Sequence, residues 1–124
     1  MATAEEISRA YWQAEMAHDI DKVMSFYRPD ATFTAPGVAL KGGEIRNFYI
    51  ESFKAFPKLE HNVNRVMGDD KLACLEWSAT LTDHDGRRRS FTGVNLAEVD
   101  GERFVSVRAY FDRKELDIAG ESNL

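Results

Sequence analysis

Three kinds of side chain in this sequence could carry acid–base chemistry: a histidine, two carboxylates and a group of tyrosines. His61 titrates near neutral pH, so it could act as an acid or a base with little adjustment of its pKa. A glutamate such as Glu76 or Glu15 becomes a base near neutral pH when apolar surroundings raise its pKa. Tyrosine hydroxyl groups can donate hydrogen bonds to an oxygen that gains negative charge during a reaction. Together these residue types would suit proton transfer on a small molecule.

Each of these residues also has an ordinary structural explanation. A surface position explains His61 equally well, and Glu76 could pair with an arginine or lie exposed at the end of a strand. A solvated helix face explains Glu15 better than a pocket does. Large aromatic residues are usually core, but a buried hydroxyl group needs a partner, and three that converge can satisfy one another. On that ground we favour a polar pocket element for the following three tyrosines: Tyr11, Tyr27 and Tyr49.

Composition excludes several other classes of function. The chain of 124 residues fits one domain, and 44% hydrophobic and 30% charged residues are ordinary for a soluble protein. A net charge of -5 argues against a nucleic-acid partner. No signal peptide or membrane-spanning stretch is visible, so we expect a cytoplasmic protein that does not bind membranes. No ligand spacing suggests a metal site, and Cys74 is the single cysteine, so we expect no metal and no other cofactor.

The order of the expected elements predicts the fold class. The capping box of Thr3 and Glu6 begins a first helix, Asp19 begins a second, and the third covers residues 44–56 after a short strand at 31–34. Alternating strands follow at 61–67, 72–82, 88–99 and 103–112, separated by turn signals. We therefore predict an α+β domain over residues 1–112, with helices packed on one face of a curved antiparallel sheet, and a polar tail over 113–124.

Three segments together are typical of a known superfamily. They are AYWQAEMAHDIDKVMSFYRPDATFTAPG, KGGEIRNFY and GVNLAEVDGERFVSVRAYFD. The chain resembles the NTF2-like superfamily over about residues 5–112, and within it the ketosteroid isomerase and SnoaL-like branch. The resemblance implies a cone in which three N-terminal helices are cupped by a strongly bent antiparallel sheet around an internal pocket. It also implies that homodimers form through the outer face of the sheet.

The resemblance further implies roles for particular residues. Tyr11 matches the tyrosine with which the steroid isomerases hold the substrate oxyanion, and Tyr27 and Tyr49 match two tyrosines of a hydrogen-bond chain. Asn95 falls where a protonated acid would donate beside Tyr11, whereas Ala35 falls where the proton-moving carboxylate would be. The acid of the related cyclases and epoxide hydrolases is missing too, because its position matches Ala109. The oxyanion side is therefore nearly complete, and the base is absent.

The same resemblance suggests replacements for the missing base. It places the face of residues 72–82 that carries Glu76 and Ser78 inside the pocket, which makes Glu76 the best candidate. His61 begins the segment HNVN, which resembles the H-x-x-N pattern of several SnoaL-like dehydratases. The opposite face, with Leu75, Trp77 and Leu81, is then expected at the surface and in the dimer contact. The expected pocket residues are Tyr11, Tyr27, Ala35, Tyr49, Ser78, Phe91, Asn95, Val107 and Phe111.

These features favour a small-molecule enzyme, an isomerase, dehydratase or cyclase that acts through an enol or enolate. Tyr11 and Asn95 would hold the oxygen, and Glu76 or His61 would move the proton. The alternative is a non-catalytic domain that binds a hydrophobic small molecule, which the missing carboxylates favour. A protein-interaction module has little support in the sequence.

Overall fold

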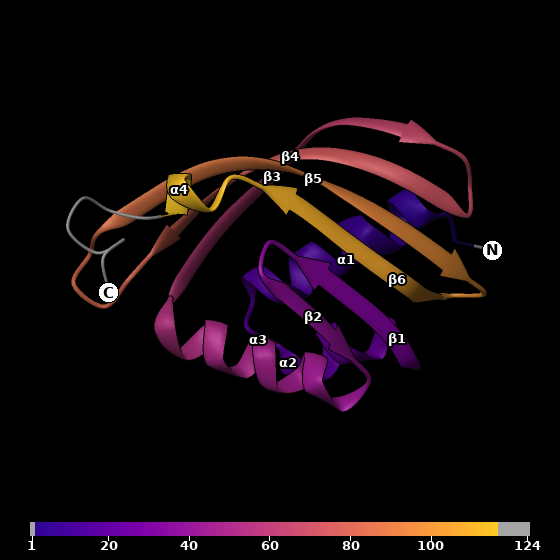
Figure 1. Ribbon diagram of the computed structural model, residues 1–124, viewed down its shortest axis with the longest axis horizontal. Coiled ribbons are helices and arrows are strands. Elements are labelled where there is room, and N and C mark those ends of the chain that lie inside the picture. Colours follow the sequence, from indigo (N-terminus) through magenta and orange to yellow (C-terminus); the bar gives the residue numbers. More distant parts are fainter. Residues whose placement is uncertain (1, 117–124) are drawn as a thin grey trace.

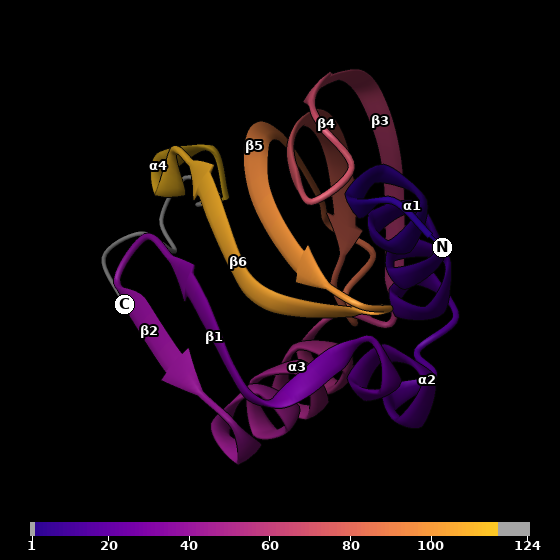
Figure 2. The ribbon, with the colours of Figure 1, turned by 90° about the vertical axis from the view of Figure 1, so that its right-hand side faces the viewer.

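The computed structural model describes residues 2–116, which form a strongly curved sheet with helices across its open side (Figures 1 and 2). The elements, in chain order, are α1 (Ala4–Met16), α2 (Ile20–Ser25), β1 (Tyr27–Ala35), β2 (Val38–Lys41), α3 (Gly43–Ala55), β3 (Lys58–Gly68), β4 (Leu72–Thr82), β5 (Arg88–Asp100), β6 (Arg103–Phe111) and α4 (Arg113–Leu116). The strand order is β2-β1-β6-β5-β4-β3, and neighbours are antiparallel except for the parallel pair β1 and β6. This is the predicted α+β cone. No helix within residues 2–116 is long and apolar enough to cross a membrane.

The helices begin where the sequence predicts. The Thr3 side chain accepts from the backbone N–H of Glu6, and the Glu6 carboxylate accepts from that of Thr3, so the predicted capping box is confirmed. The Asp19 side chain caps α2 by accepting from the backbone N–H of Lys22. One face of α1 is buried against the sheet and includes Ile7, Tyr11, Trp12 and Ala14. α1 is thereby fixed with its tyrosine facing the interior of the cone.

The edge of the sheet formed by β1 and β2 is longer than predicted. β1 begins at Tyr27 rather than at residue 31, and it contains Pro29. Proline lacks a backbone N–H, and it is accommodated because the pairing with β6 shifts register between Tyr27 and Thr32. The predicted break at residues 35–37 is a tight hairpin in which Ala35 pairs with Val38, so the unpredicted β2 continues the sheet.

The β4–β5 hairpin decides which residues face the inside of the cone. Residues directly opposite each other on neighbouring strands share a face. Trp77 lies opposite Gly93, and Leu75 lies opposite Asn95. A β-carbon on Gly93 would lie 2.5 Å from the Trp77 ring, so the missing side chain provides the space that the indole fills. Because Asn95 faces inward, Trp77 must do so too.

The predicted orientation of β4 is therefore wrong. Glu76 and Ser78 lie on the outer face, opposite Val94 and Thr92. Leu75 and Trp77, expected in a dimer contact, are 0% and 5% exposed inside the protomer. Alternation along β4 separates its two faces but does not show which face points to the interior. The resemblance places the Glu76 face inside, and the register of the β4–β5 hairpin contradicts this.

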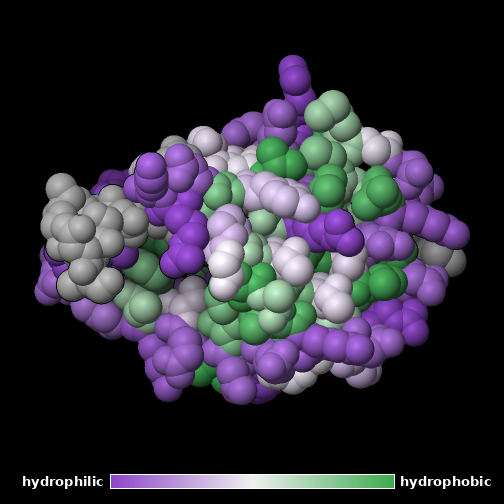
Figure 3. Space-filling model, in the orientation of Figure 1, coloured by the Kyte–Doolittle hydropathy of each residue, from purple (hydrophilic) through white to green (hydrophobic). Residues whose placement is uncertain are grey.

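A homodimer stays a prediction, but its expected contact residues are not available for it. Leu81 also lines the internal cavity, like Trp77. Figure 3 shows hydrophobic residues in the middle of the face seen in Figure 1, with hydrophilic residues around its edge. Tyr110, on the outer face of β6, is 52% exposed and is among the large hydrophobic residues at the surface. Any contact through the sheet would have to use such residues.

Candidate functional site

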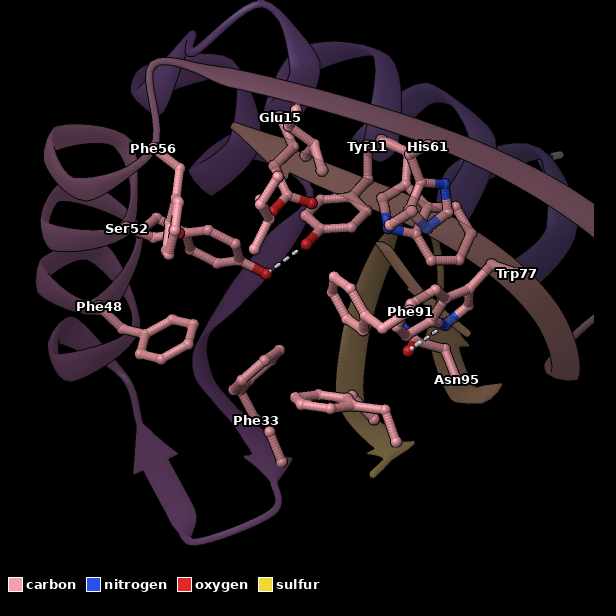
Figure 4. A pocket seen from close by; sticks show the side chains of 18 of the residues that line it. Tyr11, Glu15, Phe33, Phe48, Ser52, Phe56, His61, Trp77, Phe91 and Asn95 are labelled. Atoms are coloured by element: carbon pink, nitrogen blue, oxygen red, sulfur yellow. Dashed lines mark hydrogen bonds between the residues drawn. The ribbon is translucent and has the colours of Figure 1, made fainter. Parts of the chain in front are cut away.

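A cavity of about 420 Å³ lies between the inner face of the sheet and helices α1 and α3 (Figure 4). Its volume is that of a small-molecule site. Most of the wall is apolar and comes from Trp12, Phe33, Phe48, Phe56, Leu59, Trp77, Phe91 and Phe111. The polar side chains in the wall are those of Tyr11, Glu15, Tyr49, Glu51, Ser52, His61 and Asn95. A ligand there would be held mainly by apolar contacts and oriented by these few polar groups.

Three tyrosines from α1, β1 and α3 form one hydrogen-bonded chain. The Tyr49 hydroxyl lies 2.5 Å from that of Tyr11 and 2.8 Å from that of Tyr27. Burial raises the pKa of all three hydroxyl groups, so they stay protonated. The three hydroxyl groups have three protons but form two hydrogen bonds with one another, so one proton remains for another acceptor. If Tyr27 donates to Tyr49 and Tyr49 to Tyr11, the remaining proton is on Tyr11 at the cavity wall.

Removal of the central hydroxyl in Tyr49→Phe is expected to lower the free energy of unfolding by about 1–3 kcal/mol, because two buried hydroxyl groups lose a partner. Tyr27→Phe removes one of the two bonds and should cost less. Urea unfolding measures the difference. Tyr110→Phe is the matched control, since that side chain is 52% exposed and its loss of a hydroxyl should leave stability unchanged. If Tyr49→Phe and Tyr110→Phe were equally stable, the hydrogen-bonded chain of tyrosines would be contradicted.

Asn95 is held with its amide nitrogen available. The indole N–H of Trp77 donates to the Asn95 side-chain oxygen at 2.9 Å. An indole N–H can only donate, so the amide oxygen must face Trp77 and the amide N–H2 must point elsewhere. Asn95 is 7% exposed and borders the cavity. Its two amide hydrogens are therefore placed to donate to a ligand oxygen.

Glu15 belongs to the cavity, contrary to the favoured interpretation of a solvated helix face. It follows Tyr11 by one helical turn, so the two side chains share a face of α1. Within residues 2–116 it forms no ion pair, and burial raises its pKa to about 7, while the Tyr11 hydroxyl opposes that rise. The spacing between Tyr11 and Glu15 could have predicted this position from the sequence, because residues four positions apart lie on the same face of a helix.

His61 lies in the wall rather than at the surface. Its ring stacks on Trp12 with 4.1 Å between ring centroids and lies 5.3 Å from the Trp77 ring. The ring nitrogen Nε2 is buried and has no hydrogen-bond partner in the described part of the chain. Burial lowers the pKa of His61 to about 4, so the ring is neutral at pH 7.

The remaining predicted site residues divide between three places. Phe91, Phe111 and Ala35 line the cavity, as does Ala109. Tyr27 and Val107 are buried behind its wall and belong to the core. On the outer face, the Glu76 carboxylate is 41% exposed and lies 4.0 Å from the Arg65 guanidinium, which is the ion-pair explanation for this residue. Ser78 is on that face too and borders a separate depression there.

The curved sheet and the helices across it form an NTF2-like fold, which solved structures share. The chain belongs to the SnoaL-like domain family, whose model matches residues 8–107. No curated protein matches the chain significantly in sequence.

Solved structures share the fold at low identity. An LEH-like epoxide hydrolase of M. tuberculosis is 22% identical with a TM-score of 0.80, over 91% of this chain and 85% of that one. A ketosteroid isomerase-like protein of Catenulispora acidiphila, in complex with trimethylamine, is 13% identical with a TM-score of 0.82, over 94% and 92%. TerC, co-crystallised with polyporic acid, is 15% identical with a TM-score of 0.79, over 91% and 96%.

Proposed function

We propose that this protein is an enzyme that transfers a proton on an apolar small molecule carrying a carbonyl group, through an enol or enolate. The observation that carries the proposal is the pairing of an apolar cavity with two hydrogen-bond donors in its wall, Asn95 and Tyr11. Isomerisation, dehydration and cyclisation all belong to this class of reaction. The small molecules bound to TerC and to the Catenulispora acidiphila protein support a small-molecule ligand for this chain as well.

The donors would act on the carbonyl oxygen. As a proton leaves the neighbouring carbon, this oxygen gains negative charge, and its hydrogen bonds from the Asn95 amide and the Tyr11 hydroxyl become stronger. The apolar walls exclude water, which increases the strength of those hydrogen bonds. Tyr49 and Tyr27 would assist by donating along the chain toward Tyr11.

A non-catalytic binding domain is the second candidate. The observation in its favour is that Ala35 and Ala109 both line the cavity. By the resemblance, these are the positions at which the steroid isomerases and the related cyclases and epoxide hydrolases have a catalytic carboxylate. The two candidates differ in one measurable property. Only an enzyme would exchange the hydrogens next to the carbonyl group of a cyclic ketone for deuterium, or convert a β,γ-unsaturated cyclohexenone into its conjugated isomer.

The donor arrangement predicts that a planar phenol, such as naphthol, binds in the cavity with its oxygen at Tyr11 and Asn95. Tyr11→Phe removes a charge-assisted hydrogen bond and should weaken the binding of an ionised naphthol by about 1–3 kcal/mol. Titration calorimetry measures this change. Tyr110→Phe removes a tyrosine hydroxyl outside the cavity wall and should bind as the wild type does. Unchanged binding by Tyr11→Phe would show that the tyrosines only fill the core.

A further inference from the structure

We infer that Glu15 is the catalytic base of this site, in place of the carboxylate that Ala35 lacks. The inference rests on the proposed function and assigns the one role that the function leaves open. Glu15 extends from α1 into the pocket beside Tyr11 (Figure 4). The Asn95 amide comes from β5 and lines the same cavity. A ligand between them would have a donor at its oxygen and a carboxylate within the same cavity.

The charge of Glu15 is stabilised by the Tyr11 hydroxyl but by no cation within residues 2–116. The ionisable groups near it are the hydroxyl groups of Tyr11, Tyr27 and Tyr49, which are neutral, and the ring of His61 in the cavity wall. Glu51, at the rim on α3, is 75% exposed and lies 3.6 Å from Lys54, which is also in solvent. No cation within residues 2–116 forms an ion pair with Glu15, so both of its protonation states are accessible near neutral pH.

The other candidate bases in the wall are weaker. A neutral His61 accepts a proton only at much lower pH, because its pKa is about 4 compared with about 7 for Glu15. Its Nε2 atom is also buried from solvent. Glu51 is solvated and paired. Glu15 is therefore the group in this cavity that can take a proton from carbon at neutral pH and give it back.

The step balances without any further reactant. The Glu15 carboxylate removes a proton from the carbon next to the carbonyl group. The electron pair of that C–H bond forms a C=C bond, and the π electrons of the C=O bond move onto the oxygen, which accepts hydrogen bonds from Asn95 and Tyr11. In a β,γ-unsaturated ketone the protonated Glu15 then returns the proton to the far carbon of the extended enolate, and the conjugated ketone is released.

The first test compares proton transfer by wild-type protein, Glu15→Gln and Glu76→Gln. The reactions are deuterium exchange of a cyclic ketone, followed by NMR, and conversion of a β,γ-unsaturated cyclohexenone, followed by absorbance. Glu15→Gln should be slower by about a hundredfold or more, because an amide cannot accept the proton. Glu76→Gln is the matched control, because it removes a carboxylate on the outer face that faces Arg65 and should keep wild-type rates.

The second test uses binding alone. A fluorinated naphthol that is ionised throughout the range from about pH 6 to about pH 9 imitates the enolate. The ionised carboxylate of Glu15 repels the negative charge of the naphtholate, whereas protonated Glu15 does not. The affinity of the wild type should therefore fall roughly tenfold as pH rises through the pKa of Glu15, whereas Glu15→Gln should bind tightly at every pH.

The outcomes separate the two proposals. A wild type that catalyses exchange, with Glu15→Gln equally fast, would overturn the role of Glu15 and leave the proposed function in place. The role of Glu15 is likewise overturned if Glu15→Gln and the wild type bind the naphtholate with the same dependence on pH. A wild type that neither exchanges ketone hydrogens nor binds the naphtholate would overturn the proposed function, and the role of Glu15 with it.

Discussion

Gly93→Ala is expected to destabilise the protein by about 3 kcal/mol, although it adds a single methyl group. The added β-carbon would lie 2.5 Å and 2.7 Å from two atoms of the Trp77 ring and 2.7 Å from the backbone oxygen of Tyr110. The ring cannot move away freely, because its N–H donates to Asn95 and Trp77 is 5% exposed. The gain in strand rigidity from replacing glycine is about 0.5–1 kcal/mol and does not offset this overlap. Urea unfolding followed by circular dichroism measures the loss.

The control for this variant is Gly43→Ala at the start of α3. A β-carbon there meets no atom within 4 Å, and the position has no left-handed backbone. Stability should stay the same or increase by up to about 1 kcal/mol, since alanine restricts the unfolded chain. If Gly93→Ala were as stable as Gly43→Ala, the position of Trp77 inside the cone would be wrong, and Glu76 would again be a candidate for the pocket.

The faces of β4 could have been assigned correctly from the sequence itself. Its turn signals and alternation predict the bounds Leu72–Thr82, and the resemblance predicts that Phe91 and Asn95 face inward; the structure agrees with both. The loop after Thr82 pairs that residue with Arg88, and the same register places Trp77 opposite Gly93. A tryptophan opposite a glycine is a local sign that the ring lies across the glycine. The hairpin register therefore corrects the orientation that the resemblance suggests.

Other features depend on contacts that no local pattern reveals. Periodicity places Glu15 on the same side of α1 as Tyr11, but its burial results from β3 and α3 closing over that end of the helix, with Leu59 and Phe56 in the wall. The His61 ring stacks on Trp12 and contacts Trp77 at a tilt, which likewise joins α1, β3 and β4. The residue types of this site are visible in the sequence, whereas their pKa values are set by long-range packing.

Glu15 and His61 should affect the pH dependence of stability in opposite directions. Folding raises the pKa of Glu15 from 4.5 to about 7, so the folded state holds its proton more tightly, and stability falls as pH rises through this range. Folding lowers the pKa of His61 from 6.5 to about 4, so the unfolded state holds that proton more tightly, and stability rises between pH 4 and 6.5. Each effect amounts to about 3 kcal/mol over its whole range. In the wild type the two largely cancel between about pH 4.5 and about pH 6.5.

Removing either residue should expose the effect of the other. Glu15→Gln should become more stable, relative to the wild type, by up to about 3 kcal/mol as pH rises from 4.5 to 6.5, because His61 alone remains. His61→Phe keeps an aromatic ring against Trp12 and should show the reverse, with stability falling over the same interval as Glu15 loses its proton. The carboxylates of Glu6, Asp69 and Asp83 have lowered pKa values in the folded state, but they are common to all three proteins and cancel in the comparison. Urea unfolding of the three proteins at both pH values measures these slopes. Parallel profiles would mean that neither side chain is desolvated in the cavity, and Glu15 would then be an ordinary solvated carboxylate with no advantage as a base.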